Sequence, residues 1–449
     1  MKQRHYIIPF LCFMLLMTAT MVQGFTHWIP AKPLSGFYDA KSRVKFSKDT
    51  WLDGSFQDYL TDYARVHTGF REFLIRSYNQ LCYWCFDKIS NDNVVCGKNK
   101  ELYMTMYLDD ISGKRVKEFF ETEEQAKAVA RENVKETLRL IDTLHQHHTD
   151  FLFVFAPSKV YTDQENLPNA YQNCLKQPHF LLSEYYIELF KEAGIPYLDM
   201  FHYFRDIKDS VPYPLYTRYG SHWSAATIPF VADTLFRALE AVSGCSLPSI
   251  EVLDENISAE YSGHDCELEA LMNLYFPVEK PPVGQPVFRL TDTVGKDHPN
   301  LLVIGDSYFL MVKKSCFNDA FHYCDFWQYN ENLLTLRENL NWKKVDYYAE
   351  AYQMLEDADI VMAIVTAPFI YNYLWGFEQR AFDLFAHGPL NEEELIQLKM
   401  EEIKSIPEWY QKVVDQAEER GFTVEENLRD NAIYALRISR QNNQETSKQ

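Results

Sequence analysis

A serine and a histidine form the clearest chemical pair in this sequence. Ser307 follows Gly305 and Asp306 directly after an apolar run, and His222 lies within residues 213–226, YPLYTRYGSHWSAA. A serine hydroxyl becomes a nucleophile when a neighbouring base removes its proton, and histidine is the commonest such base. The two residues therefore predict nucleophilic acyl chemistry, provided that the fold brings them together.

The turn that carries Ser307 has further features that suit catalysis. At the start of a helix the backbone N–H of Ser307 can donate to a developing oxyanion. Gly305 would let a substrate approach the backbone closely, and we expect Asp306 to cap the turn locally rather than to act as a catalytic acid. The alternative is an ordinary strand-to-helix turn with a capping serine.

His222 is the base that this serine requires. We predict that a helix begins near Ser224 or Ala225 in the stretch SHWSAATIPFVADTLFRAL, so that His222 lies in the preceding loop. Trp223 is expected to pack under the imidazole ring and orient it. The alternative is a structural histidine without a chemical role.

The elements that position this pair belong to an alternating pattern. Helical stretches are followed by short and almost wholly apolar runs, which is typical of strands buried on both faces of a parallel sheet. These runs are 151–155, 195–201, 300–305 and 360–365. We predict an α/β doubly wound, mostly parallel sheet, at whose carboxyl edge ligands bind.

Other segments complete the predicted organisation. Residues 56–81 predict one aromatic-rich helix, and 94–104 a strand, a turn at Gly97 and a second strand. A long helix is expected after Thr122, its N-cap, with Gln125 in the capping-box position. We divide the chain into a leader (1–24), a catalytic domain (25–385) and a small helical C-terminal appendage (386–449).

Composition limits the class of protein. The chain has 449 residues, is 47% hydrophobic and carries a formal net charge of −20. The apolar content supports a sizeable core. A chain this acidic, without a dense basic stripe, is not built to coat nucleic acid.

The N-terminus predicts export. The basic sequence MKQRH is followed by an apolar run from Tyr6 to Val22 and then by Gln23 and Gly24. This is the pattern of a signal peptide, either cleaved after Gly24 or retained as a short membrane anchor. We expect the remainder outside the cytoplasm, in the periplasm, at the cell surface or secreted.

Cysteine and histidine spacing predicts no metal site and no cofactor. Of the nine cysteines, Cys12 lies in the leader and the other eight permit disulfides in an exported protein. Cys82 and Cys85 have the spacing of a redox or zinc pair, but no second such pair follows. Structural disulfides or buried thiols are the alternatives that we expect.

Four stretches in order resemble a known family. They are NVVCGKNKELY, FVFAPSKVYTDQENLP, PLYTRYGSHWS and LLVIGDSY. Over residues 25–385 the chain is similar to the SGNH-hydrolase-like domain of the alginate O-acetyltransferase AlgX/AlgJ family. The resemblance implies a flavodoxin-like core with Ser307 as nucleophile and His222 as general base. It also implies a membrane-bound O-acyltransferase partner that supplies acetyl groups, and a polysaccharide acceptor, such as an exopolysaccharide, to whose hydroxyls the serine passes them.

One departure from the family motif concerns the acid of the triad. The family usually has Asp-x-His-Trp, whereas this chain has Gly220 in the aspartate position. An acid that orients the histidine contributes orders of magnitude in rate. Another carboxylate could take this role, and the candidates are Asp199, Asp265 and Glu267. A Ser-His dyad helped by a backbone carbonyl and a degenerate site are the other two explanations.

Further residues are candidates for substrate contacts. Lys159 and Arg218 could bind an acidic sugar, and their alternative is a solvated cation. Tyr329 and Asn330 could donate to the oxyanion, and their alternative is a place in the core. The sequence thus predicts an extracytoplasmic O-acetyltransferase, with a carbohydrate acetylesterase or a glycan-binding scaffold as alternatives.

Overall fold

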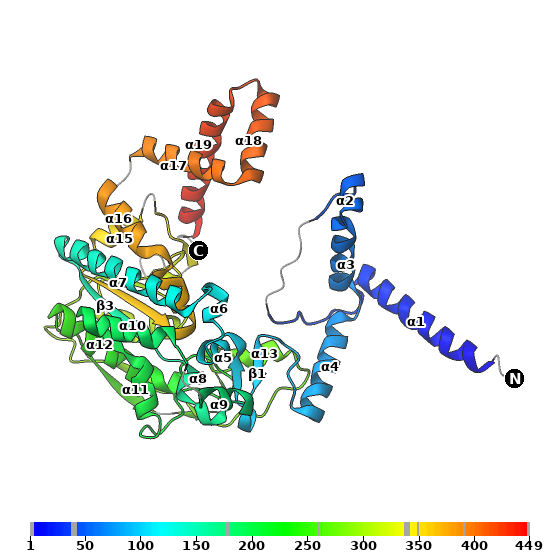
Figure 1. The fold of residues 1–449 in the computed structure, drawn as a ribbon, viewed down its shortest axis with the longest axis horizontal. Coiled ribbons are helices and arrows are strands. Elements are labelled where there is room, and N and C mark those ends of the chain that lie inside the picture. Colours follow the sequence, from blue (N-terminus) through cyan, green and yellow to red (C-terminus); the bar gives the residue numbers. More distant parts are fainter. Residues whose placement is uncertain are drawn as a thin grey trace.

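The computed structural model of the chain (Figure 1) describes residues 4–36, 43–176, 179–254, 256–258, 260–261, 263–335, 342–347, 350–388 and 391–446. Its centre is a seven-stranded sheet in the order β12-β11-β10-β9-β13-β3-β4. These strands are β3 (Asp150–Ala156), β4 (Tyr197–Asp199), β9 (Leu301–Gly305), β10 (Cys324–Gln328), β11 (Asn332–Leu334), β12 (Trp342–Lys344) and β13 (Ile360–Thr366). Strands β10, β9, β13, β3 and β4 run parallel, and β11 and β12 join antiparallel at one edge. The molecule is therefore a mixed α/β protein with a parallel-rich sheet.

The strand pairing explains why chemistry gathers at one edge of the sheet. Strand β13 lies between β9 and β3, and all seven of its residues are buried. Its register aligns Ile364 with Gly305 of β9 and Thr366 with Ala156 of β3. The loops that follow these strands therefore leave the sheet side by side at its carboxyl edge, where open α/β sheets bind ligands.

Helices pack against this sheet and against each other. Helix α10 (Leu182–Ala193) and α16 (Phe377–His387) contact α7 (Glu123–Gln146), whereas α12 (Ile228–Ser243) contacts β3 and α14 (Phe309–Lys313). The shorter helices are α5 (Thr105–Ile111), α6 (Val116–Phe119), α8 (Lys159–Thr162), α9 (Asn169–Leu175), α11 (Met200–Ile207), α13 (Glu267–Met272) and α15 (Ala351–Glu356). The 3₁₀ segments are η1 (Lys98–Lys100), η2 (Gln164–Asn166), η3 (Ala225–Thr227), η4 (Gly263–Asp265), η5 (Cys316–Ala320) and η7 (Ala367–Gly376).

Local signals in the sequence place several of these elements correctly. Thr122 caps α7 by accepting from the N–H of Gln125 at 3.1 Å. The side chain of Gln125 reaches back to the N–H of Glu121 rather than to that of Thr122, so the capping box is displaced by one residue. The predicted strand pair around Gly97 is β1 (Val94–Cys96) with β2 (Leu102–Met104), and both strands are antiparallel.

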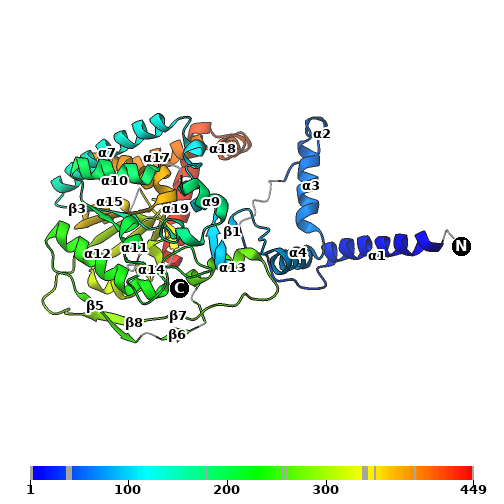
Figure 2. The same ribbon diagram turned by 60° about the horizontal axis from the view of Figure 1, so that its bottom comes forward.

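Two further pairs of short strands lie outside the central sheet. Strand β5 (Ser249–Asp254) pairs with β8 (Val287–Thr291), and β6 (Ile257–Ser258) pairs with β7 (Val283–Gly284). Figure 2 shows them along the side of the body that carries α12 and α14.

The described residues of the N-terminal part form four helices, and they correct one prediction. These are α1 (Arg4–Thr26), α2 (Lys48–Leu52), α3 (Ser55–His67) and α4 (Arg71–Phe86). The single helix expected over 56–81 is broken at Thr68 to Phe70, because Phe70 adopts a left-handed conformation with φ of 61°. Within α1, residues 7–26 are long and apolar enough to cross a membrane, and a signal sequence meets the same criteria.

The C-terminal part forms a small helical unit, as predicted. Helices α17 (Glu392–Ser405), α18 (Pro407–Arg420) and α19 (Val424–Thr446) surround their own apolar cluster, which contains Ile403, Val413 and Leu428. The boundary predicted after residue 385 falls inside the last turn of α16.

The cysteines decide between the two alternatives that the sequence left open. None of the nine is joined in a disulfide. Cys82 and Cys324 are buried, whereas Cys12, Cys85 and Cys174 are exposed. Cys82 and Cys85 lie one turn apart on α4.

Candidate active site

The fold brings Ser307 and His222 together, as the sequence predicts. The Nε2 atom of His222 lies 2.8 Å from the Oγ atom of Ser307. Ser307 sits in the turn between β9 and α14, and its carbonyl accepts from the N–H of Leu310 at 3.1 Å. The serine therefore stands at a helix start directly after a buried central strand.

Asp306 fixes the turn that presents this serine. Its carboxylate accepts from the N–H of Tyr308 at 2.9 Å, from the N–H of Thr366 at 2.7 Å and from the Thr366 hydroxyl. Complete burial raises the pKa of Asp306, although these hydrogen bonds oppose the increase. The predicted local cap is confirmed, and the same carboxylate also ties the turn to strand β13.

The loop that carries His222 is held by aromatic contacts. Trp223 is fully buried and forms a β-bridge with Tyr216. The hydroxyl of Tyr308 donates to the carbonyl of Ser221 at 2.6 Å, and its ring lies 4.9 Å from that of His222. Tyr308 rather than Trp223 therefore packs against the imidazole, while Trp223 supports Tyr308 edge-on at 5.1 Å.

The other nitrogen of His222 faces Glu267, the first residue of α13. The distance from Nδ1 to Oε1 is 2.8 Å, and the same oxygen accepts from the N–H and the hydroxyl of Ser221 at 2.8 and 2.7 Å. Burial raises the pKa of Glu267, but the hydrogen bonds and charge of His222 and the Ser221 donors outweigh it, so the net pKa is lowered. An ionised carboxylate only accepts, so Nδ1 carries the proton and Nε2 is left to accept from Ser307.

Gly220 explains why the acid comes from a different segment. A Cβ atom at this position would lie 2.6 Å from Oγ1 of Thr217 and 2.8 Å from the carbonyl of His264. The loop that carries the histidine therefore leaves no room for an aspartate two residues before it. The carboxylate beside Nδ1 of His222 belongs instead to Glu267.

The other two candidate acids do not contact His222. Asp199 caps α11 and accepts from the backbone N–H of His202 at 2.9 Å and from its Nδ1 at 2.6 Å. Asp265 accepts from the N–H of Ala225 at 3.1 Å and from the amide of Gln285 at 3.2 Å. The expectation that either carboxylate orients His222 is wrong, because both accept hydrogen bonds from other elements.

Tyr329 and Asn330, the two candidates for an oxyanion donor, have different surroundings. The N–H of Tyr329 donates to the carbonyl of Gly305 at 2.8 Å, two residues before Ser307, and burial raises the pKa of the Tyr329 phenol while the neighbouring Ser307 opposes the increase. Asn330 instead donates to the carbonyl of Trp375 at 3.1 Å and accepts from the hydroxyl of Tyr347. Asn330 is therefore structural, and the expectation that it contacts the oxyanion is wrong.

The backbone at Tyr329 and Asn330 adopts an uncommon conformation. Both Tyr329 and Asn330 have φ of 54°, in the left-handed region that bulky side chains avoid. The ring of Tyr329 lies 5.6 Å from Phe369 and 5.4 Å from Trp375 of η7. Such strain clusters at functional sites, where the surrounding packing over-determines it.

Lys159 and Arg218 are placed beside the histidine loop rather than as free cations. The ammonium of Lys159 is buried and donates to the carbonyls of Leu102, Thr217 and Arg218 at 3.0, 2.7 and 3.0 Å, and it pairs with Glu101 at 2.9 Å. The expectation that Lys159 contacts a sugar is wrong, because its donors are already used. It joins strand β2 to the loop that carries His222.

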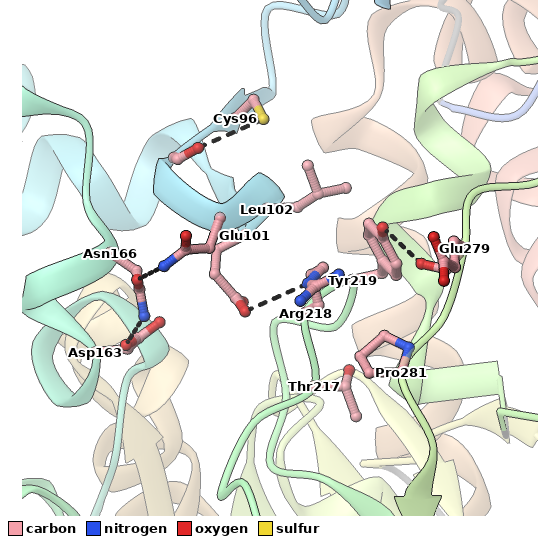
Figure 3. Close-up of polar contacts among 12 residues, drawn as sticks. Cys96, Glu101, Leu102, Asp163, Asn166, Thr217, Arg218, Tyr219, Glu279 and Pro281 are labelled. Atoms are coloured by element: carbon pink, nitrogen blue, oxygen red, sulfur yellow. Dashed lines mark hydrogen bonds and ion pairs between the residues drawn. The ribbon is translucent and has the colours of Figure 1, made fainter. Parts of the chain in front are cut away.

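Arg218 is more open than Lys159. Its Nε lies 3.8 Å from the carboxylate of Glu101 and its side chain is 30% exposed. Figure 3 shows Glu101 reaching toward Arg218, with Tyr219 directed the other way toward the carbonyl of Glu279. Arg218 therefore remains a candidate for contact with an acidic group.

The structure explains Gly305 differently from the prediction that this glycine lets a substrate approach the backbone. A Cβ atom there would lie 2.4 Å from Cγ2 of Ile364 on the adjacent strand β13. The missing side chain permits close packing of two strands rather than close approach of a substrate.

His264 is a further residue beside His222 that the sequence analysis did not single out. The ring of His264 in η4 lies edge-on to that of His222, with centroids 5.2 Å apart. Burial and the nearby charge of His222 lower the pKa of His264. The only signal in the sequence is its place in the stretch GHDCE (263–267), which also contains two of the three candidate acids.

Among the residues that the structure describes, no group of three or more His, Cys, Asp and Glu side chains is arranged to hold a metal ion.

This chain is similar to several solved structures. No protein-family model matches the chain, and no curated protein matches its sequence. The O-acetyltransferase domain of Pseudomonas putida AlgJ is similar over 64% of this chain and 99% of that one, at 14% identity and a TM-score of 0.39. Pseudomonas aeruginosa AlgX matches over 64% of this chain and 67% of its own, at 13% identity and a TM-score of 0.39. Bacillus cereus PatB1 with a sulfonyl adduct matches over 56% and 93%, at 10% identity and a TM-score of 0.35. At these identities and TM-scores, the function has to be argued from the site itself.

Proposed function

We propose that this chain is an extracytoplasmic O-acetyltransferase that moves an acetyl group through Ser307 onto a hydroxyl of a cell-surface or secreted polysaccharide. The observation that carries the proposal is the continuous relay from Ser307 through His222 to Glu267, with both hydrogen bonds at 2.8 Å. A nucleophile, a base and an orienting acid in this order are the parts of a serine acyl-transfer site.

In the first half-reaction the serine takes the acetyl group from its donor. As Oγ of Ser307 attacks the carbonyl carbon, Nε2 of His222 removes the hydroxyl proton. The carboxylate of Glu267 stabilises the imidazolium that forms. The proton then passes from Nε2 to the leaving group of the donor, and an acetyl ester of Ser307 remains.

The negative charge of the tetrahedral intermediate requires donors beside the serine. The N–H of Ser307 at the start of the helical turn is one donor, and the hydroxyl of Tyr329 is the second that we assign. Such donors act strongly because they are already fixed in position before charge develops.

In the second half-reaction a hydroxyl of the acceptor glycan replaces the leaving group. His222 removes its proton, the oxygen attacks the acetyl carbon, and Ser307 departs with the proton that Nε2 returns. Water in place of the glycan would give an acetylesterase, which shares every step up to the acetyl-serine. Preferential binding of the glycan therefore decides between the two activities.

The setting of the reaction belongs to the same proposal. The apolar helix α1 supports export as a signal or anchor. The motif resemblance supports a membrane-bound O-acyltransferase as the partner that supplies acetyl groups. It also supports a doubly wound, flavodoxin-like arrangement of the parallel-rich sheet, and Arg218 as a contact for an acidic sugar.

The test is intact-mass analysis after incubation with an activated acetyl ester such as p-nitrophenyl acetate. The native chain should gain one acetyl group or turn over the ester, and Ser307→Ala should do neither while keeping its circular dichroism spectrum. Addition of oligosaccharide acceptors should then move the acetyl group to the glycan. Release only as acetate would favour the esterase, and an inert folded native chain would favour a glycan-binding scaffold.

A further inference from the structure

Helix α4 exposes its apolar side chains to the outside. The side chains that are half exposed or more are Phe73, Leu74, Tyr78, Leu81, Trp84 and Phe86. Leu74, Tyr78 and Leu81 lie four and three residues apart, which places them on one stripe of the helix. After Glu72 the only charged side chain of α4 is Arg76, and it is buried. The outer stripe therefore carries no charge.

The polar side chains of α4 point into the protein instead. Arg76 donates to the carbonyl of Pro33 at 2.8 Å, and Asn79 donates to the carbonyl of Met272 at 2.9 Å. The side-chain oxygen of Gln80 accepts from two successive backbone N–H groups, those of Tyr275 and Phe276, at 3.1 Å each. This is the inverse of a surface helix in a soluble protein, which buries its apolar stripe and exposes its polar one.

The segment beside α4 extends this apolar surface. Trp84 stacks on Phe276 with ring centroids 5.5 Å apart, and Phe73 meets Tyr275 edge-on at 5.7 Å. Tyr275 and Phe276 are themselves exposed. The α4 face, as we define it, consists of Phe73, Leu74, Tyr78, Leu81, Trp84, Phe86, Tyr275 and Phe276. Contiguous exposed patches of this kind mark sites of interaction with proteins or membranes.

Helix α1 indicates which occupant fits the α4 face. Its last turns pack against the turn between α3 and α4, where the N–H of Gly69 donates to the carbonyl of Thr20 at 3.2 Å. The approach is so close that a Cβ atom at Gly69 would lie 2.2 Å from that carbonyl oxygen. In both ribbon views α1 projects away from the body from this contact near the start of α4 (Figures 1 and 2). A bilayer crossed by α1 would therefore begin beside the α4 face.

The chemistry of the α4 face also fits a bilayer surface. Trp and Tyr side chains are enriched where membrane proteins meet the headgroup layer, because one part of each ring system is apolar and one part is polar. Trp84, Tyr78 and Tyr275 provide such groups among the exposed leucine and phenylalanine side chains. Trp28, two residues after the end of α1, is also exposed.

We infer that the α4 face lies in the interfacial layer of a phospholipid bilayer and forms a second membrane contact beside α1. This membrane contact would also fix the position of the candidate site relative to the bilayer. The polar side of α4 binds the segment at the end of α13, and Glu267 is the first residue of that helix. Tyr83 of α4 also packs in one apolar cluster with Leu268 and Met272 of α13. The helix that contacts lipid is thus the helix that supports the candidate acid, so the site is held at a fixed height above the membrane. The inference does not depend on the proposed acetyl transfer.

The experiment uses the full chain, with α1 retained, in nanodiscs of phosphatidylethanolamine and phosphatidylglycerol. Tryptophan emission is compared between discs with ordinary acyl chains and discs with brominated ones, which quench only tryptophans in contact with lipid. Trp84→Phe is expected to lose about a third of the bromolipid quenching of the native chain, since Trp84 is one of the few tryptophans placed to reach the interface. Trp342→Phe is the matched control, because Trp342 is also exposed but lies on edge strand β12 of the central sheet, and it should change nothing.

Two results would overturn the inference. Unchanged bromolipid quenching in Trp84→Phe, with emission of Trp84 quenched by aqueous iodide, would place the α4 face in water. Emission of Trp84 that is protected from both quenchers would place a protein surface over it, such as a second copy of the chain. A second variant, Leu81→Glu, addresses the face without changing a tryptophan, and it should reduce the Trp84-dependent bromolipid quenching at least twofold by drawing the helix away from the acyl chains.

Discussion

Three described histidines, His147, His202 and His222, have a carboxylate at Nδ1, and His222 and His202 differ in what faces the other nitrogen. His222 has Glu267 at Nδ1 and the hydroxyl of Ser307 at Nε2. His202 has Asp199 at Nδ1 at 2.6 Å and a second carboxylate, Glu184, at Nε2 at 3.0 Å. The group that faces Nε2 is therefore the difference between the two residues. A hydroxyl at this nitrogen suits a base, whereas a second carboxylate suits an imidazole that stays protonated.

The electrostatic result of this difference is large. Hydrogen bonds from His202 to Asp199 and Glu184 raise the pKa of His202 to about 10. An imidazole that keeps its proton at neutral pH cannot accept one from a nucleophile. His202 thus joins α11 to α10 as a structural ion pair, and the comparison shows that a carboxylate–histidine contact alone does not identify an active site.

The largest effect expected from this comparison is on the two histidines themselves. His222→Gln should lower the rate of acetyl-ester turnover by about 10⁴-fold or more, because the serine loses its base. His202→Gln should leave kcat within about threefold of the native value, since the residue does not touch the site. Turnover of p-nitrophenyl acetate measures both, and similar losses in the two variants would contradict the distinction.

The next effect concerns the acid. Glu267→Gln keeps the shape of the side chain but removes its charge, so kcat should fall by about 10²–10⁴-fold. The pH dependence of kcat in this variant distinguishes a loss of charge from a loss of fold. Glu267→Gln combined with Gly220→Asp should not regain activity, because Thr217 and the carbonyl of His264 occupy the space for a side chain at 220. Recovery in the double variant would show that the loop can accept the acid of the family motif.

A smaller loss of kcat is expected from a change beside Ser307. Tyr329→Phe removes the phenol hydroxyl and leaves the ring between Phe369 and Trp375. If that hydroxyl donates to the oxyanion, kcat should fall by about 10²-fold while KM changes little. The corresponding control is Tyr347→Phe, because the hydroxyl of Tyr347 donates to the carbonyl of Asn330.

The smallest effect is on stability and belongs to His202. Its folded-state pKa of about 10 lies above its unfolded value, so its contribution to the free energy of unfolding is complete at acidic pH. That contribution is lost as the pH rises from about 6.5 to about 10. The native chain should lose about 1–2 kcal/mol over this range relative to His202→Gln, after allowance for solvent screening. Urea unfolding at pH 6 and pH 10 measures it, and parallel pH profiles in the two proteins would be the contrary result.

Much of the site could be predicted because its signals are local. Ser307 follows an apolar strand, and such strands end at the edge where ligands bind, so the sheet and the nucleophile follow from the same pattern. His222 precedes a helix that begins where the sequence indicates, at Ala225 in η3. These features need only neighbours in the chain.

The rest depends on contacts between distant segments. Glu267 could not be separated from Asp199 and Asp265, because sequence spacing does not show which carboxylate the fold turns toward an imidazole. The burial of Lys159 and the packing of Gly305 against Ile364 likewise arise from residues far along the chain. Local apolar content predicted a helix at α4, but it could not show that this helix faces outward.

Gly220 has a consequence for how chains of this kind are classified. A motif search that requires an aspartate two residues before the histidine would not find this chain, because position 220 is glycine. In this structure the carboxylate oxygen beside Nδ1 of His222 comes from Glu267, 45 residues later in the sequence, and not from position 220. Sorting active from inactive chains therefore needs a search in space for any carboxylate within hydrogen-bond reach of that nitrogen.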